Sequence, residues 1–520
     1  MDRLIDQFIM AKEVFGIDLG TTNSCIAEIS SLDKLPVVIK NAEDLQTTPS
    51  VVYYDDYGSP IVGGEAKRSM AQNSSRAVAF IKREMSNPTY KREIDGEIIS
   101  PVKVSAMILK KLVEDANLSR EYRGKPKIKD VVITVPAYFG NNERALTKQA
   151  GEVAGLNVLA LLNEPTAAAL SYGTSHLEGK NFMIYDLGGG TFDVSIMRMS
   201  KGALETLSTD GDHHLGGVDW DIELVNYVLS NCCGTSDRYE NIKDTRDGGA
   251  LILAAEQCKK LLSKNLESPM RFRYRNRMYT KPIKRSLFEE LTSDFLQRTI
   301  DVVKHAMAIS TDKDAAINEI ILVGGSSYMP MVKERLRKEF PGTTIRLDQF
   351  EPDLSVAKGA AIHAYNIANP QNTPAADVKI GKDLASRSYG VGIVMRETNE
   401  DKIQNLILRT DSIVYSGTAT TCTRFDDQTS VYIPIYENTS IDRFVDQSHG
   451  TLIAAKTITW GFPVPKDTDI NYVIKREHDG IVHIEVECQG KKIFFDIKPD
   501  QALSEYEKTR LKREIDGMQL

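Results

Sequence analysis

The order of hydrophobic and polar positions divides this 520-residue chain into two parts with different periods. From about residue 13 to 369, short β-branched runs alternate with stretches in which apolar residues recur every three or four positions, as in α/β domains. This helical period predicts helices over 102–117, 142–154, 218–231, 247–264 and 286–308.

Beyond about residue 385 the helical period nearly vanishes, and short apolar runs recur between turn residues. This pattern predicts an antiparallel β domain with strands near 404–408, 430–436, 453–459, 470–475, 481–487 and 492–497. Ser504 and Glu507 form a capping box, which predicts one last helix over 504–516 with Gly517 as its C′ residue.

A Pro-, Asn- and Ala-rich stretch at 369–376 separates the two parts and reads as a domain boundary. The expected organisation has an N-terminal extension, an α/β domain, a linker, a β domain and a C-terminal helical segment. In that order their ranges are 1–12, 13–369, 370–388, 389–499 and 500–520.

Composition narrows the classes of protein that fit. The formal net charge is −7, which argues against a protein that holds nucleic acid by bulk charge. The Arg271–Arg277 run alternates basic and aromatic residues; we favour a strand with one solvated face over a single-strand nucleic-acid binder. Six cysteines without a C-x-x-C pair, no secretory signal and no membrane-length apolar run predict a cytoplasmic protein that binds no membrane.

Two copies of one motif carry the strongest chemical signal. F-G-I-D-L-G-T-T-N-S (15–24) and I-Y-D-L-G-G-G-T-F-D (184–193) each have an apolar strand ending in Asp, a Gly/Thr turn and a second strand. Glycines let backbone N–H groups approach a phosphate, and an Asp at the strand end suits Mg²⁺ held through its waters. Two copies at this separation predict two related lobes that grip one nucleotide. The chain has no G-x-x-x-x-G-K-[ST], so it is not a P-loop protein.

Two further segments fit the same site. I-L-V-G-G-S-S-Y-M-P (321–330) is a buried strand that runs into a Gly-Gly turn able to pass under an adenosine, or an ordinary strand–helix connection. Glu164, before Pro165 and an Ala-rich helix, could orient water or Mg²⁺, or could serve only as a charge at a helix N-terminus.

Together with V-I-T-V-P-A-Y-F (132–139), N-E-P-T-A-A-A-L (163–170) and H-L-G-G-V-D-W-D (214–221), these motifs resemble the heat-shock protein 70 family of DnaK-type chaperones. The resemblance runs nearly end to end and is strongest from 14 to 365. It implies an α/β actin-like two-lobed ATPase domain followed by an all-β sandwich domain and one short C-terminal helix. It also implies an ATP-dependent chaperone that hydrolyses ATP to ADP with Mg²⁺ and binds extended, unfolded polypeptide segments.

The resemblance assigns roles by motif. It implies catalytic roles for Asp18, Lys82, Glu164, Asp186, Thr191 and Asp193. Among these, Lys82 would position the attacking water, and Asp18 and Asp186 would hold Mg²⁺ through water. It implies nucleotide contacts by Gly20, Thr21, Thr22, Asn23, Gly188, Gly189, Gly190, Glu256, Lys259, Lys260, Ser263, Gly324, Gly325, Ser326, Tyr328 and Asp353.

Departures from the family pattern change the expected coupling and partners. Tyr328 replaces an arginine that stacks on adenine, and Ala160 replaces the arginine that engages J-domain cochaperones in bacterial members. A nucleotide-exchange factor remains an implied partner, whereas a J-domain cochaperone is disfavoured. The segment 377–389 lacks the usual leucine run and has little to bury, so we expect weak coupling, with ATP changing peptide affinity by less than about tenfold.

The β domain aligns more loosely with the family. The resemblance implies peptide contacts by Ile393, Thr421, Arg424, Val431 and Ile433, although Thr421 stands where an aromatic is usual. Only one helix stands where the family has a helical lid of about a hundred residues, which predicts a β domain that is essentially without a lid.

Two classes of function therefore remain open. One is an ATP-driven peptide-binding chaperone, and the other is an actin-like ATPase whose β domain is an adaptor for one dedicated partner. A small-molecule kinase would share the fold, but the β domain and the N-E-P-T-A-A-A-L segment disfavour it.

Overall fold

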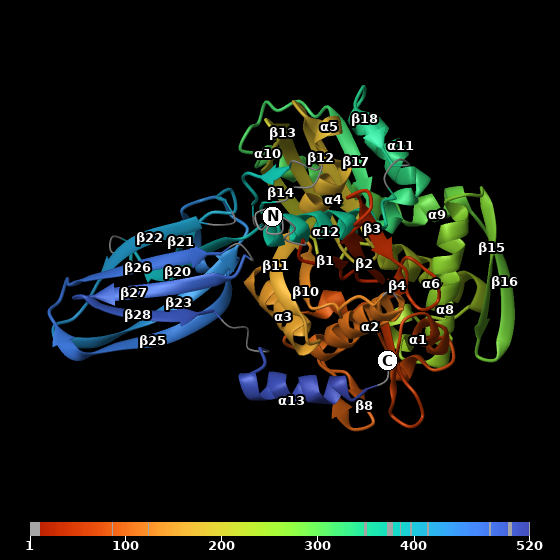
Figure 1. Cartoon of the computed structure of the whole chain (residues 1–520), viewed down its shortest axis with the longest axis horizontal. Coiled ribbons are helices and arrows are strands. Elements are labelled where there is room, and N and C mark those ends of the chain that lie inside the picture. Colours follow the sequence, from red (N-terminus) through yellow and green to blue (C-terminus); the bar gives the residue numbers. More distant parts are fainter. Residues whose placement is uncertain are drawn as a thin grey trace, which may run out of the picture.

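The chain forms a two-lobed α/β body with a β-sandwich docked against its side (Figure 1). The computed structural model describes residues 11–85, 87–122, 124–347, 351–371, 378–384, 386–395, 398–412, 415–477, 480–497, 502–518 and 520. Most of the predicted N-terminal extension and the middle of the predicted linker lie outside these residues. Among them, no helix is long and apolar enough to cross a bilayer.

The first lobe is built on a sheet of order β11-β10-β1-β2-β3, to which β4 adds beside β2. Its strands are β1 (Phe15–Asp18), β2 (Asn23–Ile29), β3 (Pro36–Ile39), β4 (Thr48–Pro49), β10 (Asp130–Val135) and β11 (Asn157–Asn163). Strand β10 is parallel to β1, whereas β2 and β3 are antiparallel to their neighbours. The helices that pack with this sheet are α2 (Pro101–Glu121), α3 (Asn141–Val153), α4 (Glu164–Tyr172) and α12 (Ser355–Ala368).

The second lobe repeats this plan with a sheet of order β18-β17-β12-β13-β14-β19. Its strands are β12 (Asn181–Leu187), β13 (Phe192–Ser200), β14 (Ala203–Asp212), β17 (Glu319–Val323), β18 (Thr344–Arg346) and β19 (Lys379–Ile380). Strand β17 lies parallel to β12 as β10 does to β1, and β12 and β13 form an antiparallel hairpin as β1 and β2 do. The predicted duplication is therefore present in the topology.

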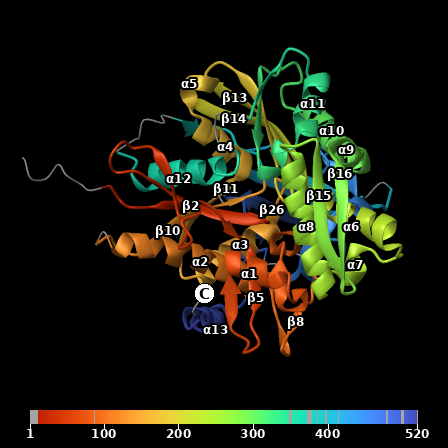
Figure 2. The same cartoon turned by 90° about the vertical axis from the view of Figure 1, so that its right-hand side faces the viewer.

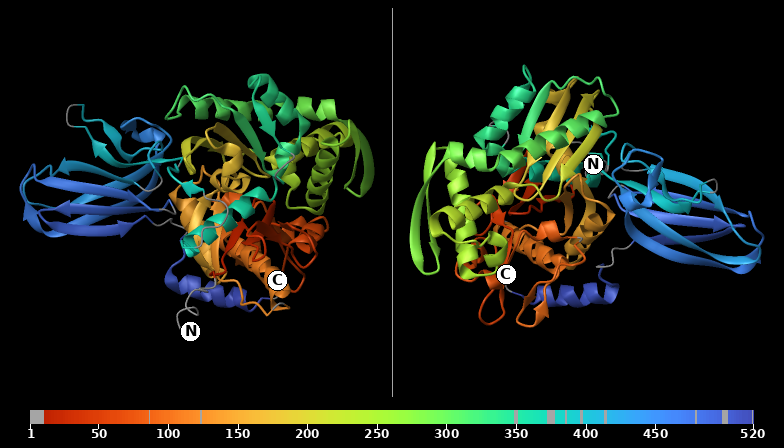
Figure 3. Two further views of the ribbon diagram at one scale, coloured as in Figure 1. Left: turned by 45° about the horizontal axis from the view of Figure 1, so that its top comes forward. Right: turned by 180° about the vertical axis from the view of Figure 1, so that it is seen from behind.

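Smaller elements complete each of the two lobes (Figures 2 and 3). The first lobe adds α1 (Gly64–Met70), η1 (Ser74–Arg76), η2 (Ile81–Glu84), β5 (Val51–Tyr54), β6 (Pro60–Val62), β7 (Ala77–Ala79), β8 (Glu93–Ile94) and β9 (Glu97–Ile98). The second lobe adds α5 (Thr174–Leu177), α6 (Gly217–Cys233), α7 (Tyr239–Ile242), α8 (Arg246–Leu262), α9 (Arg285–Leu291), α10 (Ser293–Ala308), α11 (Pro330–Glu339), η3 (Gly325–Tyr328), β15 (Glu267–Tyr274) and β16 (Arg277–Lys284).

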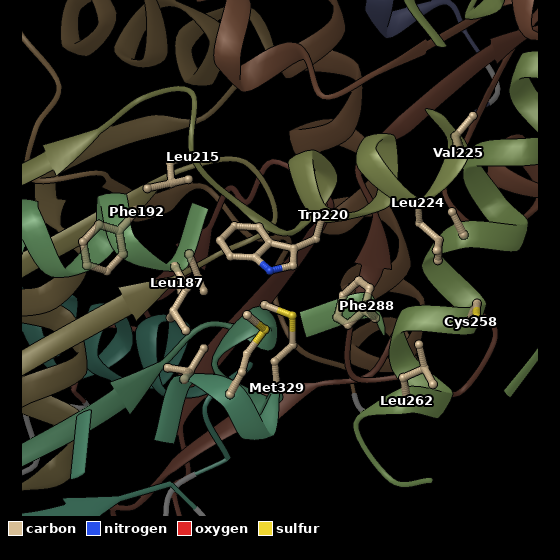
Figure 4. Close-up of a cluster of buried hydrophobic side chains, with 14 of the residues drawn as sticks. Leu187, Phe192, Leu215, Trp220, Leu224, Val225, Cys258, Leu262, Phe288 and Met329 are labelled. Atoms are coloured by element: carbon tan, nitrogen blue, oxygen red, sulfur yellow. The ribbon is translucent and has the colours of Figure 1, made fainter. Parts of the chain in front are cut away.

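The hydrophobic core of the second lobe holds helix α6 in place. Trp220 of α6 is fully buried among Leu187 and Phe192 of the β12–β13 hairpin and Met329 of the chain that follows β17 (Figure 4). One cluster thus joins α6 to the β12–β13 hairpin and to the chain after β17. Burying each side chain of this size stabilises the folded state by roughly 1.5–3 kcal/mol.

The predicted helices exist, with one correction. The stretch 286–308 is two helices, α9 and α10, rather than one, because the chain leaves helical geometry at Thr292 (φ −113°, ψ 13°). The hydroxyl of Thr292 donates to the carbonyl of Phe288, which satisfies a carbonyl at the end of α9.

The β domain is a sandwich of two antiparallel sheets, as predicted. Their orders are β24-β21-β20-β23-β25 and β22-β26-β27-β28. The strands are β20 (Ser388–Val394), β21 (Asp401–Ile407), β22 (Tyr415–Cys422), β23 (Gln428–Asn438), β24 (Phe444–Asp446), β25 (Thr451–Val464), β26 (Asp469–Arg476), β27 (Val482–Cys488) and β28 (Lys491–Asp496), with η4 (Gln447–His449) before β25. Alternate residues of both sheets, such as Ile435, Trp460 and Ile484, fill the space between them.

The last helix, α13 (Glu505–Asp516), begins at the predicted capping box of Ser504 and Glu507. Its last turn packs on the first lobe: Ile515 is fully buried in that lobe's core, and Lys110 donates to the carbonyl of Ile515 at 2.5 Å. Gly517 follows the helix as its C-cap with φ −79°, rather than as the predicted C′ residue in the left-handed conformation typical of that position.

The segment before the sandwich is docked, which corrects the prediction that it has little to bury. Val378 and Leu384 are 4% and 1% exposed, and β19 extends the second-lobe sheet by pairing with β14. Backbone N–H groups of Lys379 and Gly381 donate to the carbonyls of Gly202 and Leu204 at 2.9 and 2.8 Å. Strand addition therefore supplies the docking that a leucine run was expected to provide.

Candidate functional site

A cavity of about 770 Å³ lies between the two lobes and is lined by both. The first lobe contributes the turn between β1 and β2, η2 and the start of α4. The second contributes the turn between β12 and β13, helix α8 and the Gly-Gly turn after β17. The duplicated sheets thus bring the two hairpin turns to opposite sides of one space.

The two phosphate-type turns face each other at close range. A Cβ added to Gly189 would lie 2.4 Å from Oγ1 of Thr22, and one added to Gly190 would lie 2.6 Å from Oγ1 of Thr21. Only glycine leaves room for the threonine hydroxyls here, so backbone N–H groups and hydroxyls from both lobes line one concavity.

Behind these turns lies a group of buried carboxylates with one lysine. Lys82 of η2 donates to Oε1 of Glu164 at 2.5 Å, and both side chains are almost fully buried. Asp18 is the last residue of β1 and Asp186 the last but one of β12, and Asp193 accepts the backbone N–H of Tyr138 at 3.0 Å. The negative charges in this group outnumber the positive one.

Burial and the neighbouring charges together raise the pKa values of all three aspartates and of the lysine in this group. Burial, reinforced by Glu164, raises the pKa of Asp18 to about 7 and that of Asp193 to about 7. Burial also raises the pKa of Asp186 well above its usual range. Burial acts against the charge of Lys82, but Glu164 and Asp18 outweigh it and raise the pKa of Lys82.

Such a group fits a divalent cation bound with a nucleotide. Excess buried carboxylate needs positive charge, and acid oxygens are what hard cations take as ligands. In the described ranges, no three His, Cys, Asp or Glu side chains are set to hold a metal directly. Asp18 and Asp186 are the residues of this group that could hold Mg²⁺ through its waters, of which Mg²⁺ usually keeps several.

The mouth of the cavity is crossed by an ion-pair network on α8. Glu256 lies 2.6 Å from Lys67 of α1 in the opposite lobe and 2.7 Å from Lys260. Although burial opposes ionisation, these two lysines lower the pKa of Glu256 to about 2. Lys259 instead donates to Asp221 at 2.7 Å and to the carbonyl of Gly217, so it braces α8 against α6.

The Gly-Gly turn after β17 forms the remaining wall. Gly324 has φ +80°, and a Cβ there would lie 2.5 Å from the carbonyl oxygen of Leu187, so the turn requires glycine. Tyr328 and Asp353 line the same side of the cavity, and burial raises the pKa of Asp353. Tyr328 is 39% exposed, which leaves its ring accessible from the cavity.

The structure brings nearly all predicted nucleotide-site residues together. Every one of them lines the cavity except Gly190 and Asp193. Gly190 lies just beneath the wall, where its carbonyl accepts a hydrogen bond from Arg83 at 2.7 Å.

Sequence reasoning missed Lys67 and the ion pair of Arg83 with Asp219, which also spans the lobes. Sequence reasoning also missed Asp221, which accepts a hydrogen bond from Lys259. Asp221 lies in the H-L-G-G-V-D-W-D motif, so that motif could have pointed to it. The helix that carries Lys67 gave no signal.

The five predicted peptide-contact residues are not gathered on one surface. Ile433 is fully buried in the sandwich core, and Ile393 and Val431 pack against the same core while half-buried. Thr421 belongs to the other sheet, where its hydroxyl donates to Oη of Tyr472 at 3.0 Å, and Arg424 is exposed. In this conformation Ile433 is not accessible to a bound peptide.

Comparison with known proteins settles the family. The family model described as Hsp70 protein matches residues 14–519. The chain belongs to the Hsp70 family. Two relatives are the chaperone proteins DnaK of Thermosipho melanesiensis and Thermosipho africanus, which are 35% and 36% identical over 487 and 489 residues. Each alignment covers 92% of this chain and 78% of the relative. This Hsp70 protein therefore comes from a family of ATPase chaperones.

Proposed function

We propose that this Hsp70 protein hydrolyses ATP to ADP and phosphate in the cavity between its lobes. The observation that carries the proposal is the pair of facing phosphate turns with Lys82 and Glu164 enclosed behind them. Two sets of N–H and hydroxyl donors suit a polyphosphate, and the wall formed by α8 and the Gly-Gly turn suits a nucleoside.

The proposed chemistry is positioning with charge stabilisation. Phosphoryl transfer to water spreads negative charge over the transferred group, so groups fixed where that charge develops lower the barrier most. Lys82 is fixed on the short helix η2 and held by Glu164, which places an ammonium group beside the phosphate turns. Thr21, Thr22 and Thr191 supply hydroxyl donors from both lobes.

Mg²⁺ would be held at Asp18 and Asp186 through its waters, where it would neutralise phosphate charge. Glu164 accepts a hydrogen bond from Lys82 and is the first residue of helix α4. Its carboxylate would therefore respond to the charge of a phosphate group bound beside Lys82. Asp193 accepts the backbone N–H of Tyr138 through Oδ1, which fixes the orientation of its carboxylate.

The direct test is turnover by the full chain. With Mg²⁺ and ATP, it should release phosphate slowly and bind ADP in a calorimetric titration. Chelation of the divalent cation should abolish turnover. If neither nucleotide binds, the assignment of the cavity is wrong.

We further propose that the sandwich binds extended polypeptide and that the nucleotide controls this binding. The supporting contacts run from the cleft to the docked segment. Asn163, which directly precedes Glu164, donates through Nδ2 to Oδ2 of Asp383 at 3.2 Å and to the carbonyl of Leu384 at 3.1 Å. A movement of Glu164 would therefore be passed to the linker through its neighbour Asn163, which bonds to Asp383 and Leu384.

Asp383 is the centre of this contact. It also accepts the hydroxyls of Thr166 and Thr206 at 3.1 and 3.0 Å, so one buried carboxylate ties together both lobes and the linker. Arg409 of the sandwich donates to the carbonyl of Thr209 and to Asp210 at 2.7 and 3.0 Å. Docking thus rests on specific polar bonds that a rotation of the lobes would break.

A second candidate function is a dedicated adaptor, which the burial of Ile433 and the hydrogen bond of Thr421 to Tyr472 favour. A peptide array probed with the full chain, with ADP and with ATP, separates the two. Binding to many apolar segments that ATP weakens supports the chaperone. Binding to none, or to a single sequence in both nucleotides, supports the adaptor.

A further inference from the structure

One sheet of the sandwich ends in a strand whose outer edge is open. Strand β28 is the last strand in the order β22-β26-β27-β28, so it pairs with β27 and, among the residues that the structure describes, with no other strand. It lies in the part of the sandwich that projects from the two-lobed body (Figure 1). An open edge offers backbone N–H and C=O groups to another chain.

The hydrogen-bond register of β28 shows which backbone groups face outward. The N–H of Ile497 donates to the carbonyl of Val482 of β27 at 3.3 Å, and bonded positions alternate along an antiparallel pair. Odd-numbered residues of β28 therefore bond to β27. The N–H and C=O groups of Lys492, Phe494 and Asp496 point away from β27, so all three residues can bond to a strand laid along this edge.

The same three residues also form the solvent face of the strand. Phe494 is 65% exposed, and the side chains of Lys492 and Asp496 are 52% and 58% exposed. Ile493 and Phe495, which alternate with them, pack against the sandwich core. A large exposed ring on an open strand is a feature that marks an interaction surface.

The outward pattern of Lys492, Phe494 and Asp496 is complementary to itself. Only residues on the same face of a sheet can lie opposite each other. When two copies of β28 pair antiparallel about a two-fold axis at Phe494, each Lys492 lies opposite Asp496 of the second copy, and the two rings meet on the axis. Moving the axis to Ile493 places Lys492 opposite Phe494 and Asp496 opposite Gly490, which loses both charge pairs. The charges therefore select one register.

The lysine on this edge could instead serve only to discourage pairing, as lysines on edge strands commonly do. Lys492 has that effect toward a strand without a carboxylate at the opposite position, but a second copy supplies one. Within one chain, Nζ of Lys492 lies 2.7 Å from Glu485, and Asp496 lies 2.7 Å from Nδ1 of His483. Such exposed pairs hold their side chains weakly, so both charges remain available to a second copy.

The antiparallel arrangement also keeps the two bodies apart. The end of β28 that carries Asp496 lies near the body, where Oδ1 of Asn141 accepts the N–H of Val482 at 2.9 Å. The other end of β28 is the turn of Gln489 and Gly490. Antiparallel pairing therefore places the bodies of the two copies at opposite ends of the shared sheet.

We propose that β28 is a self-association edge, at which two copies of this chain join their β22-β26-β27-β28 sheets into one continuous sheet. The same edge serves both copies, so the contact closes as a two-fold dimer. Because one strand pair buries little surface, the dimer is weak and reversible. This inference goes beyond the proposed function and depends on neither nucleotide nor peptide.

Sedimentation velocity of the full chain between about 1 and 200 µM should show a reversible dimer. Lys492→Asp and Asp496→Lys each place like charges opposite each other twice in the dimer, so each should raise its Kd at least about tenfold. An equimolar mixture of the two variants restores both charge pairs and should dimerise within about threefold of the unaltered chain. Asp401→Lys, at an exposed carboxylate of the other sheet, is the matched control and should dimerise normally.

Residue-resolved amide exchange of the unaltered chain locates the contact without any substitution. The N–H groups of Lys492, Phe494 and Asp496 should gain protection as the concentration rises, whereas those of Ile493 and Phe495 already bond to β27 and should not change.

A chain that stays monomeric throughout the concentration range overturns the proposal. So does a dimer that both charge reversals leave unchanged, or one that gives the outward N–H groups of β28 no protection. If the reversals weaken binding of an extended peptide and leave the dimer intact, the edge takes polypeptide rather than a second copy, and the proposal is wrong.

Discussion

At the scale of single residues, a substitution of Lys82 should separate the binding of ATP from its hydrolysis. Its ammonium group lies behind the phosphate turns, where charge builds up only as the phosphoryl group transfers. Lys82→Ala should leave ATP affinity within a few-fold and lower single-turnover hydrolysis by about 10²-fold or more, since one such contact is worth about 3 kcal/mol.

Lys40→Ala is the matched control for this variant, because Lys40 is exposed on the same lobe and pairs only with Asp44 among the described residues. Its turnover should equal that of the unaltered chain. Parallel loss of affinity and turnover in Lys82→Ala would make Lys82 a ground-state ligand and refute the role proposed for it.

Tyr328 tests the nucleoside end of the cavity. We predict that Tyr328→Ala weakens ADP by about 1–2 kcal/mol, because the ring no longer lies against adenine, whereas Tyr328→Phe keeps the ring and stays near the unaltered affinity. Calorimetric titration with ADP measures both. Equal affinities for ADP in all three proteins would show that Tyr328 does not contact the nucleotide.

Residue by residue, the site was predictable where its chemistry is contiguous in sequence. Asp18 with its threonines and Asp186 with its glycines each fall within one hairpin, so pattern and spacing reveal them. Lys67 acts through Glu256, 189 positions away, and Arg83 through Asp219, 136 positions away. No local pattern marks such partners, because only the closure of the lobes brings them together.

At the scale of elements, the segment 378–384 shows how a count of apolar residues can mislead. It was expected to dock poorly because it lacks consecutive leucines, yet it adds a strand to β14 and buries Val378, Leu384 and the carboxylate of Asp383. Backbone pairing depends little on side-chain identity, so it leaves almost no trace in composition. The ground for weak coupling that was drawn from the composition of this segment is therefore removed, whereas Ala160 and the single C-terminal helix still stand as grounds for it.

Substitution of Asp383 should weaken the coupling between nucleotide binding and peptide release. Asp383→Ala leaves the amide of Asn163 and the hydroxyls of Thr166 and Thr206 without their acceptor in a buried site, which costs about 1–3 kcal/mol of docking. We predict that ATP-stimulated peptide release slows by about tenfold while basal ATP hydrolysis stays within a few-fold. Stopped-flow release of a labelled peptide measures the first, and phosphate release the second.

The exposed carboxylate Asp401 provides the control, because Asp401→Ala removes a charge from the sandwich without touching the linker. Release from this variant should match that from the unaltered chain. If Asp383→Ala also releases peptide at the unaltered rate, the docked segment does not transmit the nucleotide state.

At the scale of the whole molecule, the duplicated lobes followed from the sequence, but the placement of the sandwich did not. The lobes share one motif, so the repeat implies related sheets. Docking rests on pairs such as Arg409 with Asp210 and Val482 with Asn141, which are 199 and 341 positions apart. Such contacts depend on the geometry of two finished domains and leave no periodic signal in either.

The most direct test of the account is the rate at which a fluorescent apolar peptide leaves the full chain, followed by anisotropy with ADP and then with ATP. In this conformation Ile433 is buried in the sandwich core, and Arg409 ties the sandwich to the lobes. We propose that ATP favours this docked form and that it holds peptide poorly. The account predicts binding with ADP and release at least about tenfold faster after ATP is added, since affinity differences appear mainly in off-rates. No binding with ADP, or equal release rates in the two nucleotides, would contradict it and leave the sandwich as a dedicated adaptor.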